Sequence, residues 1–381
     1  MPKTTIKASN NVNYDFKILY ALGIIFIVMG HCNGGGISVF NEFFPFYSFH
    51  IALFIFASGY FYNSQNESSV KNFILKKTQK LIIPLYLWNF LYACIMQTIK
   101  HFGFFPSVHV NLETLFITPI INGHQFLLNL AGWFIIPLYM IHVINILVRK
   151  VFFKFNIKIN EFIYFGICLL LGLIGVSLSA HGYNRDWFLV LDRVLYFLPF
   201  YSLGILYRKY EKYDKQGNLV YFGTILFISL MLIYKYNSMP IVIPSWADFG
   251  THGTIMPFIV GILGIAFWLR ISKILSPSIG QNKYINILAD NTYTIMINHL
   301  LGAKIVNTFF ALLYKYTNLC SGFNMESYKT MWNYFYLPHN LPQFLVLYVL
   351  FGIIFSIAFQ KIILYATNPL KKLFPSLRNF Q

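Results

Sequence analysis

Apolar residues in this chain come in long runs, and the polar and charged residues gather between them. Ten runs have a length close to the roughly 20 residues with which a helix crosses a bilayer. They cover residues 16–33, 46–62, 82–99, 130–148, 162–179, 187–207, 219–235, 254–270, 285–313 and 343–366. This pattern predicts an all-α, polytopic transmembrane helix bundle of about ten spans. Because no polar stretch is long enough for a second core, residues 1–381 are expected to form one membrane-embedded domain with no appended soluble domain.

The composition supports this prediction and excludes other classes of protein. Of 381 residues, 57% are hydrophobic and only 11% are charged, whereas a soluble domain averages about 25% charged. A soluble enzyme and a disordered chain are therefore excluded. The four cysteines show no CxxC spacing, so neither a disulfide framework nor a metal site is expected.

The net charge of +17 would suggest a nucleic-acid partner in a soluble protein. Here the positive residues alternate along the chain. One set of alternate connections holds 22 of the 29 Lys and Arg residues, and the other set holds five. Cytoplasmic connections of membrane proteins carry this excess. We therefore expect a multi-pass protein of the cell (plasma) membrane with both termini in the cytoplasm, a lipid bilayer as partner, and no nucleic acid.

Seven ionisable residues of the predicted spans are taken as candidates for function, because an ionisable group is costly inside a membrane. They are His31, His50, His142, Asp192, Arg193, His299 and Lys304. A helix rise of about 1.5 Å per residue places His31 about 22 Å and His299 about 21 Å from the inner face. His50, Asp192 and Arg193 fall at a similar level, His142 lies deeper, and Lys304 lies at the outer surface. Four helices are thus predicted to place polar groups in one layer of the outer leaflet.

Structural roles compete with this interpretation. A single membrane histidine more often bonds a neighbouring helix, which is the role we favour for His142. Asp192 and Arg193 can each pair with another span, which is as good an account of them as catalysis. The basic residues Lys76, Lys77 and Lys80 either fix topology and contact headgroups or form a cationic mouth for a phosphorylated cofactor.

Several short segments stand out when they are taken in order along the chain. They are residues 14–17 and 24–31, which end in Gly-His; 49–61, a Phe-rich run into Ser-Gly; 76–86; Trp133-Phe134; and 291–299, with Tyr-x-Ile-x-x-x-His. Together they resemble the acyltransferase-3 family of integral membrane acyltransferases, especially its sugar O-acetyltransferase branch. Two positions depart from the family pattern: Tyr20 stands where many members carry Arg, and Ala52 where Pro is common. The first departure puts an Arg-based role in doubt, for which Asp15 and Lys17 can substitute locally.

The resemblance implies transfer of an acyl group, by default acetyl with succinyl as the alternative, from cytoplasmic acyl-CoA to a carbohydrate hydroxyl. The acceptor would be a polysaccharide, a lipid-linked glycan or an oligosaccharide of the cell surface. In this hypothesis His31 is the general base or an acyl relay, and His299 or His50 orients it or stabilises the oxyanion. Arg193, beside Asp192, neutralises developing negative charge.

The same resemblance assigns binding roles. The candidates for substrate binding are Asp15, Lys17, Trp133 and Tyr293, while Lys76, Lys77 and Lys80 would hold the phosphates of acetyl-CoA. The alternative is a transporter or flippase for a glycan precursor, in which the buried His, Asp and Arg residues relay protons or bind the substrate. The sequence shows no internal repeat, which favours the enzyme.

Overall fold

The computed structural model describes residues 12–32, 40–317 and 319–373, with side chains through residue 366. Nine helical segments in these ranges are long and apolar enough to cross a membrane. They are α1 (Tyr14–His31), α4 to α5 (Val70–Lys100), η5 to α7 (Leu127–Lys154), α8 (Glu161–Ala180), α9 (Asp186–Tyr210) with η6 (Glu211–Tyr213), α10 (Asn218–Tyr236), α11 (Met256–Ile279), α13 (Thr292–Tyr316), and η9 (Pro342–Phe344) with α15 (Leu345–Leu373). The all-α, multi-pass fold class is confirmed.

The second predicted span forms a shorter helix, α3 (Phe46–Tyr60). Its 15 residues reach about 22 Å, which is less than the roughly 30 Å hydrocarbon core. Thirteen of the 15 are buried, because α1, α9 and α11 pack around it. The helix α3 is therefore the central element of the bundle, and every predicted span corresponds to a helix.

The ends of several helices differ from the predicted runs. The run 285–313 is broken at Asn291, whose φ of −110° and ψ of 18° separate α12 (Lys283–Asp290) from α13. The predicted run 130–148 corresponds to a helical segment that starts earlier, at Leu127. This segment begins with the 3-10 turns of η5 (Leu127–Phe134), which kink at Asn129, and continues as α7 (Ile135–Lys154). Before α5 (Ile83–Lys100), the helix α4 (Val70–Lys77) continues through a π-helical turn, η3 (Thr78–Ile82), next to Pro84.

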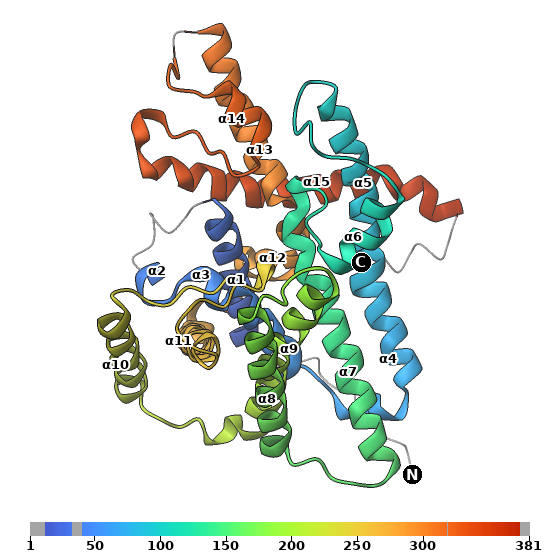
Figure 1. The fold of residues 1–381 in the computed structure, drawn as a ribbon, viewed down its shortest axis with the longest axis vertical. Helices are drawn as coiled ribbons and strands as arrows, with labels where there is room; N and C mark the ends of the chain where they lie inside the picture. Colours follow the sequence, from blue (N-terminus) through green and yellow to red (C-terminus); the bar gives the residue numbers. More distant parts are fainter. Residues whose placement is uncertain (1–11, 33–39, 318, 374–381) are drawn as a thin grey trace.

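Short helices fill the connections. They are α2 (Phe40–Phe43), η2 (Ser64–Ser68), η4 (Glu113–Ile117), α6 (Thr118–Ile121), η7 (Pro244–Trp246), α14 (Met325–Thr330) and η8 (Pro338–Asn340). In Figure 1 the connections after α3, α7 and α9 lie together at the lower end of the molecule. The connection after α5 and the segment around α14 lie at the upper end. In this view the connections after α3, α7 and α9, which belong to the positively charged set, therefore lie away from the connection after α5 and the segment around α14, which belong to the other set.

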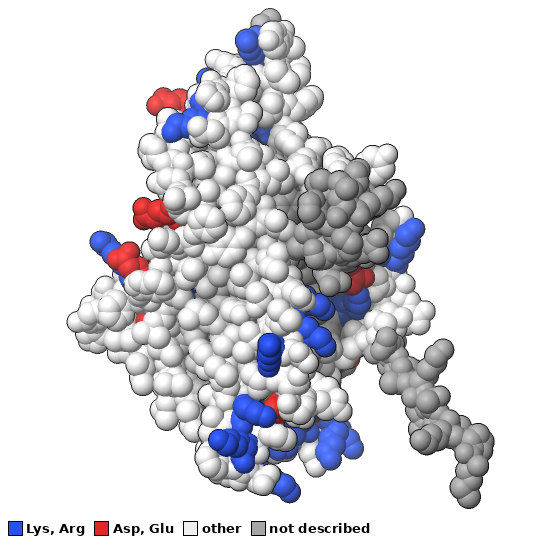
Figure 2. All heavy atoms as spheres, turned by 90° about the vertical axis from the view of Figure 1, so that its right-hand side faces the viewer, with Lys and Arg blue, Asp and Glu red and all other residues white. Residues whose placement is uncertain are grey.

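Helices pack against one another mainly through apolar and small residues. The helix α9 packs against both α8 and α3, and α13 packs against α15. The helix α10 buries only Ile225 and Ser229, and Figure 1 shows it at the edge of the bundle. On the face shown in Figure 2, most Lys and Arg side chains lie in the lower half, and the upper half carries few charges.

Candidate functional site

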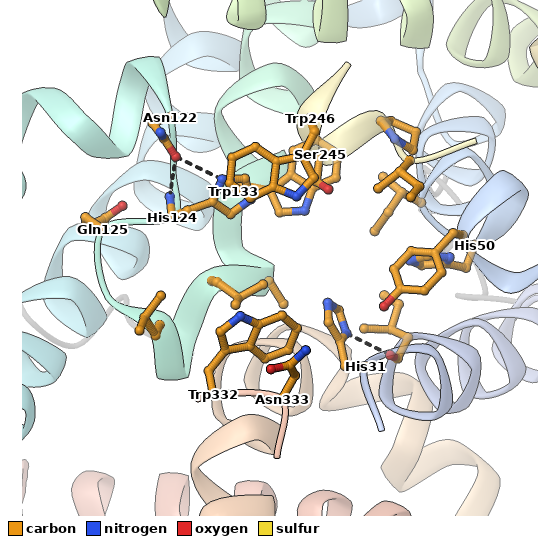
Figure 3. Close-up of a pocket in the computed structure, with 18 of the residues that line it drawn as sticks. His31, His50, Asn122, His124, Gln125, Trp133, Ser245, Trp246, Trp332 and Asn333 are labelled. Carbon is orange, nitrogen blue, oxygen red and sulfur yellow. Dashed lines mark hydrogen bonds between the residues drawn. The ribbon is translucent and has the colours of Figure 1, made fainter. Parts of the chain in front are cut away.

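A cavity of about 530 Å³ lies where α1 and α3 meet three further segments, which include the short helices α6 and η7 and the 3-10 turns of η5. The helix α1 contributes Ile27 and His31, and α3 contributes Tyr47, His50 and Ile51. The remaining wall comes from residues 118–133, 243–246 and 332–333. Figure 3 shows the two histidines on one side and the residues around Asn122 and Trp246 on the other. The cavity thus has a histidine wall and a facing amide and aromatic wall.

His31 and His50 are each fixed to the helix that carries them. Nδ1 of His31 lies 2.8 Å from the carbonyl oxygen of Ile27, and Nδ1 of His50 bonds the carbonyl oxygen of Phe46. Since a carbonyl oxygen only accepts, Nδ1 donates in both residues, which leaves a lone pair on Nε2 of the neutral ring. The free nitrogen of His31 points into the cavity (Figure 3).

His299 lies directly behind His31. The ring centroids of these residues are 5.0 Å apart, although they come from α1 and α13. Nδ1 of His299 donates to the carbonyl oxygens of Ile295 and Met296, at 3.0 and 2.8 Å. Its Nε2 is buried and has no hydrogen-bond partner within the described chain. A second unprotonated nitrogen therefore lies next to the base candidate.

Arg193 supports the cavity wall from behind. Its guanidinium donates to the carbonyl oxygen of Asn122 at 2.9 Å and to that of Ser245. It also lies 4.7 Å from the ring centroid of Trp133, which lines the cavity. Arg193 thus connects two wall segments, and the carbonyl dipoles of these segments stabilise its positive charge. The neighbouring Asp192 is buried, and neither of its carboxyl oxygens has a partner among the described residues.

The facing wall is built around His124. Asn122 Oδ1 accepts from both the backbone N–H and Nδ1 of His124, at 3.0 and 2.9 Å. The His124 ring stacks on Trp246, with 4.2 Å between centroids. Burial and the charge of Arg193 lower the pKa of His124 to about 3. The ring is therefore neutral near pH 7, with its lone pair on Nε2.

Other residues that the sequence nominated lie away from this cavity. Asp15 and Lys17 are at the opposite end of α1 from His31, about 20 Å away by helix rise, and Lys17 pairs with Asp290. Tyr293 donates to the carbonyl oxygen of Leu81 at 3.5 Å and does not line the cavity. Of the four proposed substrate-binding residues, only Trp133 lies in its wall.

The three lysines proposed to bind CoA differ in their surroundings. Lys76 and Lys80 are exposed, and neither pairs with an acidic side chain of the described residues. Nζ of Lys77 instead lies 3.0 Å from Nε2 of His142, whose Nδ1 lies 3.0 Å from the Tyr201 hydroxyl. Lys76 and Lys80 therefore remain accessible at the surface, whereas Lys77 has an internal partner.

One of the seven ionisable candidates from the sequence analysis has surroundings that the sequence did not predict. Lys304 was expected at the outer surface, but its side chain is buried beneath the segment around α14. Its ammonium group donates to the carbonyl oxygens of Tyr328 and Met331, and it lies 4.7 Å from the Phe105 ring centroid. The aromatic rings and carbonyl oxygens offset the cost of burying this charge.

Sequence reasoning missed half of the cavity. The missed polar and aromatic residues are Tyr47, Thr118, Asn122, His124, Gln125, Ser245, Trp246, Trp332 and Asn333. Most lie in connections, which apolar periodicity does not order. The usable signal was that the long segments 100–129 and 314–342 are rich in Asn, His and aromatic residues.

Together the fold and the cavity define a class: a multi-pass helical membrane protein with a partly open cavity that is walled on one side by histidines. The chain belongs to the acyltransferase-3 family, because that family's acyltransferase domain matches residues 13–361. It is thus a membrane acyltransferase. Comparison with curated proteins found no match, and comparison with solved structures found none either.

Proposed function

We propose that this acyltransferase moves an acetyl group from cytoplasmic acetyl-CoA to a hydroxyl of a carbohydrate that is lipid-linked or exposed at the cell surface. The observation that carries the proposal is the placement of His31. Its Nδ1 is held by Ile27, so Nε2 offers a lone pair to the cavity that would receive the acceptor.

In direct transfer, the acceptor oxygen attacks the thioester carbon while its proton passes to Nε2 of His31. The carbon–sulfur bond then breaks, and the departing CoA sulfur takes a proton from the imidazolium. A positioned histidine suits both steps because it can accept and return a proton near neutral pH. A relay in which His31 itself carries the acetyl group uses the same lone pair.

His299 supports the charged intermediate of this cycle. Once His31 is protonated, its ring carries a positive charge, and the unprotonated Nε2 of His299 is on the adjacent ring, 5.0 Å away between centroids. The tautomer set by the Ile295 and Met296 carbonyls gives this nitrogen no proton. An unprotonated Nε2 cannot donate a hydrogen bond to an oxyanion, so His299 is better suited to orienting His31 or to relaying its proton.

The test compares His31→Ala with His181→Ala, which removes an exposed histidine at the end of α8. Loss of a general base typically costs about 10²–10⁴-fold in rate. Purified His31→Ala should therefore show transfer from radiolabelled acetyl-CoA reduced by at least about 100-fold with unchanged detergent stability, whereas His181→Ala should match the wild type. Retention of more than about a tenth of the wild-type rate in His31→Ala would refute the assigned role.

The acceptor class has its own test. Cell-surface polysaccharide from cells with and without this protein is compared by NMR for acetyl ester signals. Ester signals that depend on the protein and disappear in His31→Ala support carbohydrate O-acetylation. Identical spectra in all three samples contradict it.

A further inference from the structure

The lining of the cavity carries no fixed charge. Its described residues include amides, hydroxyls, histidines and aromatic rings, but no Lys, Arg, Asp or Glu. The closest guanidinium, that of Arg193, lies behind Trp133 and is already bonded to two backbone carbonyls. A charged ligand group in this space would therefore find no counter-charge.

We propose that the cavity selects an acceptor whose reacting sugar is uncharged: a neutral hexopyranose held between Trp246 and Trp332, with uronic acids and phosphosugars disfavoured. This inference rests on the proposed function, because it names the substrate class of the same site.

The two tryptophans give flat apolar surfaces on facing sides of the chamber (Figure 3). Trp246 is fixed by its stack on His124, with centroids 4.2 Å apart, and it lines the cavity. The Trp332 ring centroid is 6.3 Å from that of His31. A pyranose packs its C–H face on an indole and keeps its hydroxyls at the edge. A ring resting on Trp332 thereby presents hydroxyls to His31.

The unpartnered polar atoms of the facing wall point to the same ligand chemistry. Nδ1 of His124 donates to Asn122 Oδ1, so Nε2 of His124 is an acceptor, and it is buried without a partner in the described structure. Oε1 of the adjacent Gln125 is likewise a buried acceptor without a partner. Orphaned acceptors are satisfied by hydroxyl donors. A carboxylate has no proton to donate and would be repelled.

The test uses two pairs of glycosides that differ only at C6: methyl β-D-glucoside against its glucuronide, and methyl β-D-galactoside against its galacturonide. Binding to the full-length protein in detergent is measured by saturation-transfer NMR without acetyl-CoA, and transfer is measured separately as kcat/KM. Because a carboxylate without a partner is costly to desolvate, each neutral member should bind at least about tenfold more tightly than its acid. Trp332→Ala should weaken sugar binding and leave the KM for acetyl-CoA unchanged.

A charge-gain variant provides the decisive control. Asn333 lines the cavity and is exposed at its rim, so Asn333→Lys should fold and shift the preference toward the uronides. Ser321→Lys adds the same charge to the same connection at an exposed position outside the cavity lining, and it should leave the preference unchanged.

The outcomes separate the two proposals. Equal binding within each pair, no binding of any glycoside, or an Asn333→Lys variant that behaves like Ser321→Lys would overturn the inference. Binding of the neutral sugars without transfer supports the inference and overturns the proposed function. Equal transfer to acid and neutral sugars overturns the inference and leaves the proposed function standing.

Discussion

Histidines in this protein are positioned by local backbone bonds and given different surroundings by the fold. His31, His50 and His299 each donate Nδ1 to the carbonyl oxygen four residues earlier, which is a contact within one helix turn. His124 differs, because its Nδ1 partner is the Asn122 side chain and its neighbour is a tryptophan from another connection. The first arrangement fixes tautomers, and the second joins two segments of the facing wall of the cavity.

His124 should make stability depend on pH. Its pKa is about 3 in the folded protein, below the roughly 6.5 of an unfolded chain. Between these values the unfolded state binds a proton that the folded state does not, so stability is lost as pH falls. The melting temperature of the wild type should therefore fall more steeply between pH 6.5 and pH 4.5 than the melting temperature of His124→Gln. A His181→Gln control should follow the wild type, and equal slopes in all three proteins would contradict the assignment.

At the scale of elements, α3 and α9 approach so closely that glycine is required on both. A Cβ added at Gly59 would overlap the Tyr201 carbonyl oxygen, and one added at Gly204 would overlap that of Phe56. Neither contact can be relieved by a side-chain rotation, because both partners are backbone. This pair of glycines brings α9 against the helix that carries His50.

Gly59→Ala and Gly204→Ala should each lower the melting temperature and the acyl-transfer rate. Overpacking a well-filled interior typically costs about 1–3 kcal/mol, and a backbone clash belongs at the upper end. Gly166→Ala and Gly223→Ala are matched helix controls with open space at the new Cβ. They should be neutral or slightly stabilising, since Ala is favoured over Gly in a helix by about 1 kcal/mol. Equal effects at all four positions would disprove the close-packing argument.

The basic segment of α4 and η3 supports a prediction about the donor. The double variant Lys76→Gln, Lys80→Gln should raise the KM for acetyl-CoA, because exposed ammonium groups attract its phosphates, and the effect should shrink at high salt. Lys154→Gln with Lys158→Gln removes two exposed lysines from the same predicted side and should leave KM unchanged. An equal rise in both double variants would indicate only general surface charge.

At the scale of the whole molecule, the alternating positive charge predicts orientation in the membrane. A reporter fused after Gln381, beyond the described residues, should behave as cytoplasmic, and one inserted between Gly322 and Met331 as external. The reason is that 22 of the 29 Lys and Arg residues lie in one set of connections, which the cytoplasmic side retains. An external C-terminus would overturn this orientation and the outer-leaflet position of the histidine layer.

Hydrophobic pattern by itself determined the helical, multi-pass fold, because burying backbone in lipid forces each long apolar run to become a helix. It also singled out His31, His50 and His299, since ionisable residues stand out in such runs, and helix rise alone placed them near one level. It could not reveal that Lys17 pairs with Asp290 or that Lys77 faces His142, because these facts depend on which helix faces which.

Only the tertiary structure decided the facing wall of the cavity. His124, Trp246 and Trp332 lie on connections that have no periodicity to read. His124 and Trp246 meet where Arg193 of α9 donates to the carbonyls of Asn122 and Ser245, and Trp332 lies against His31. The same packing sets the His31 and His299 rings 5.0 Å apart. The sequence determines the depth of each residue along its helix, because the rise per residue is constant. The rotation of each helix about its axis, and the helices that it contacts, depend on how all the helices pack together.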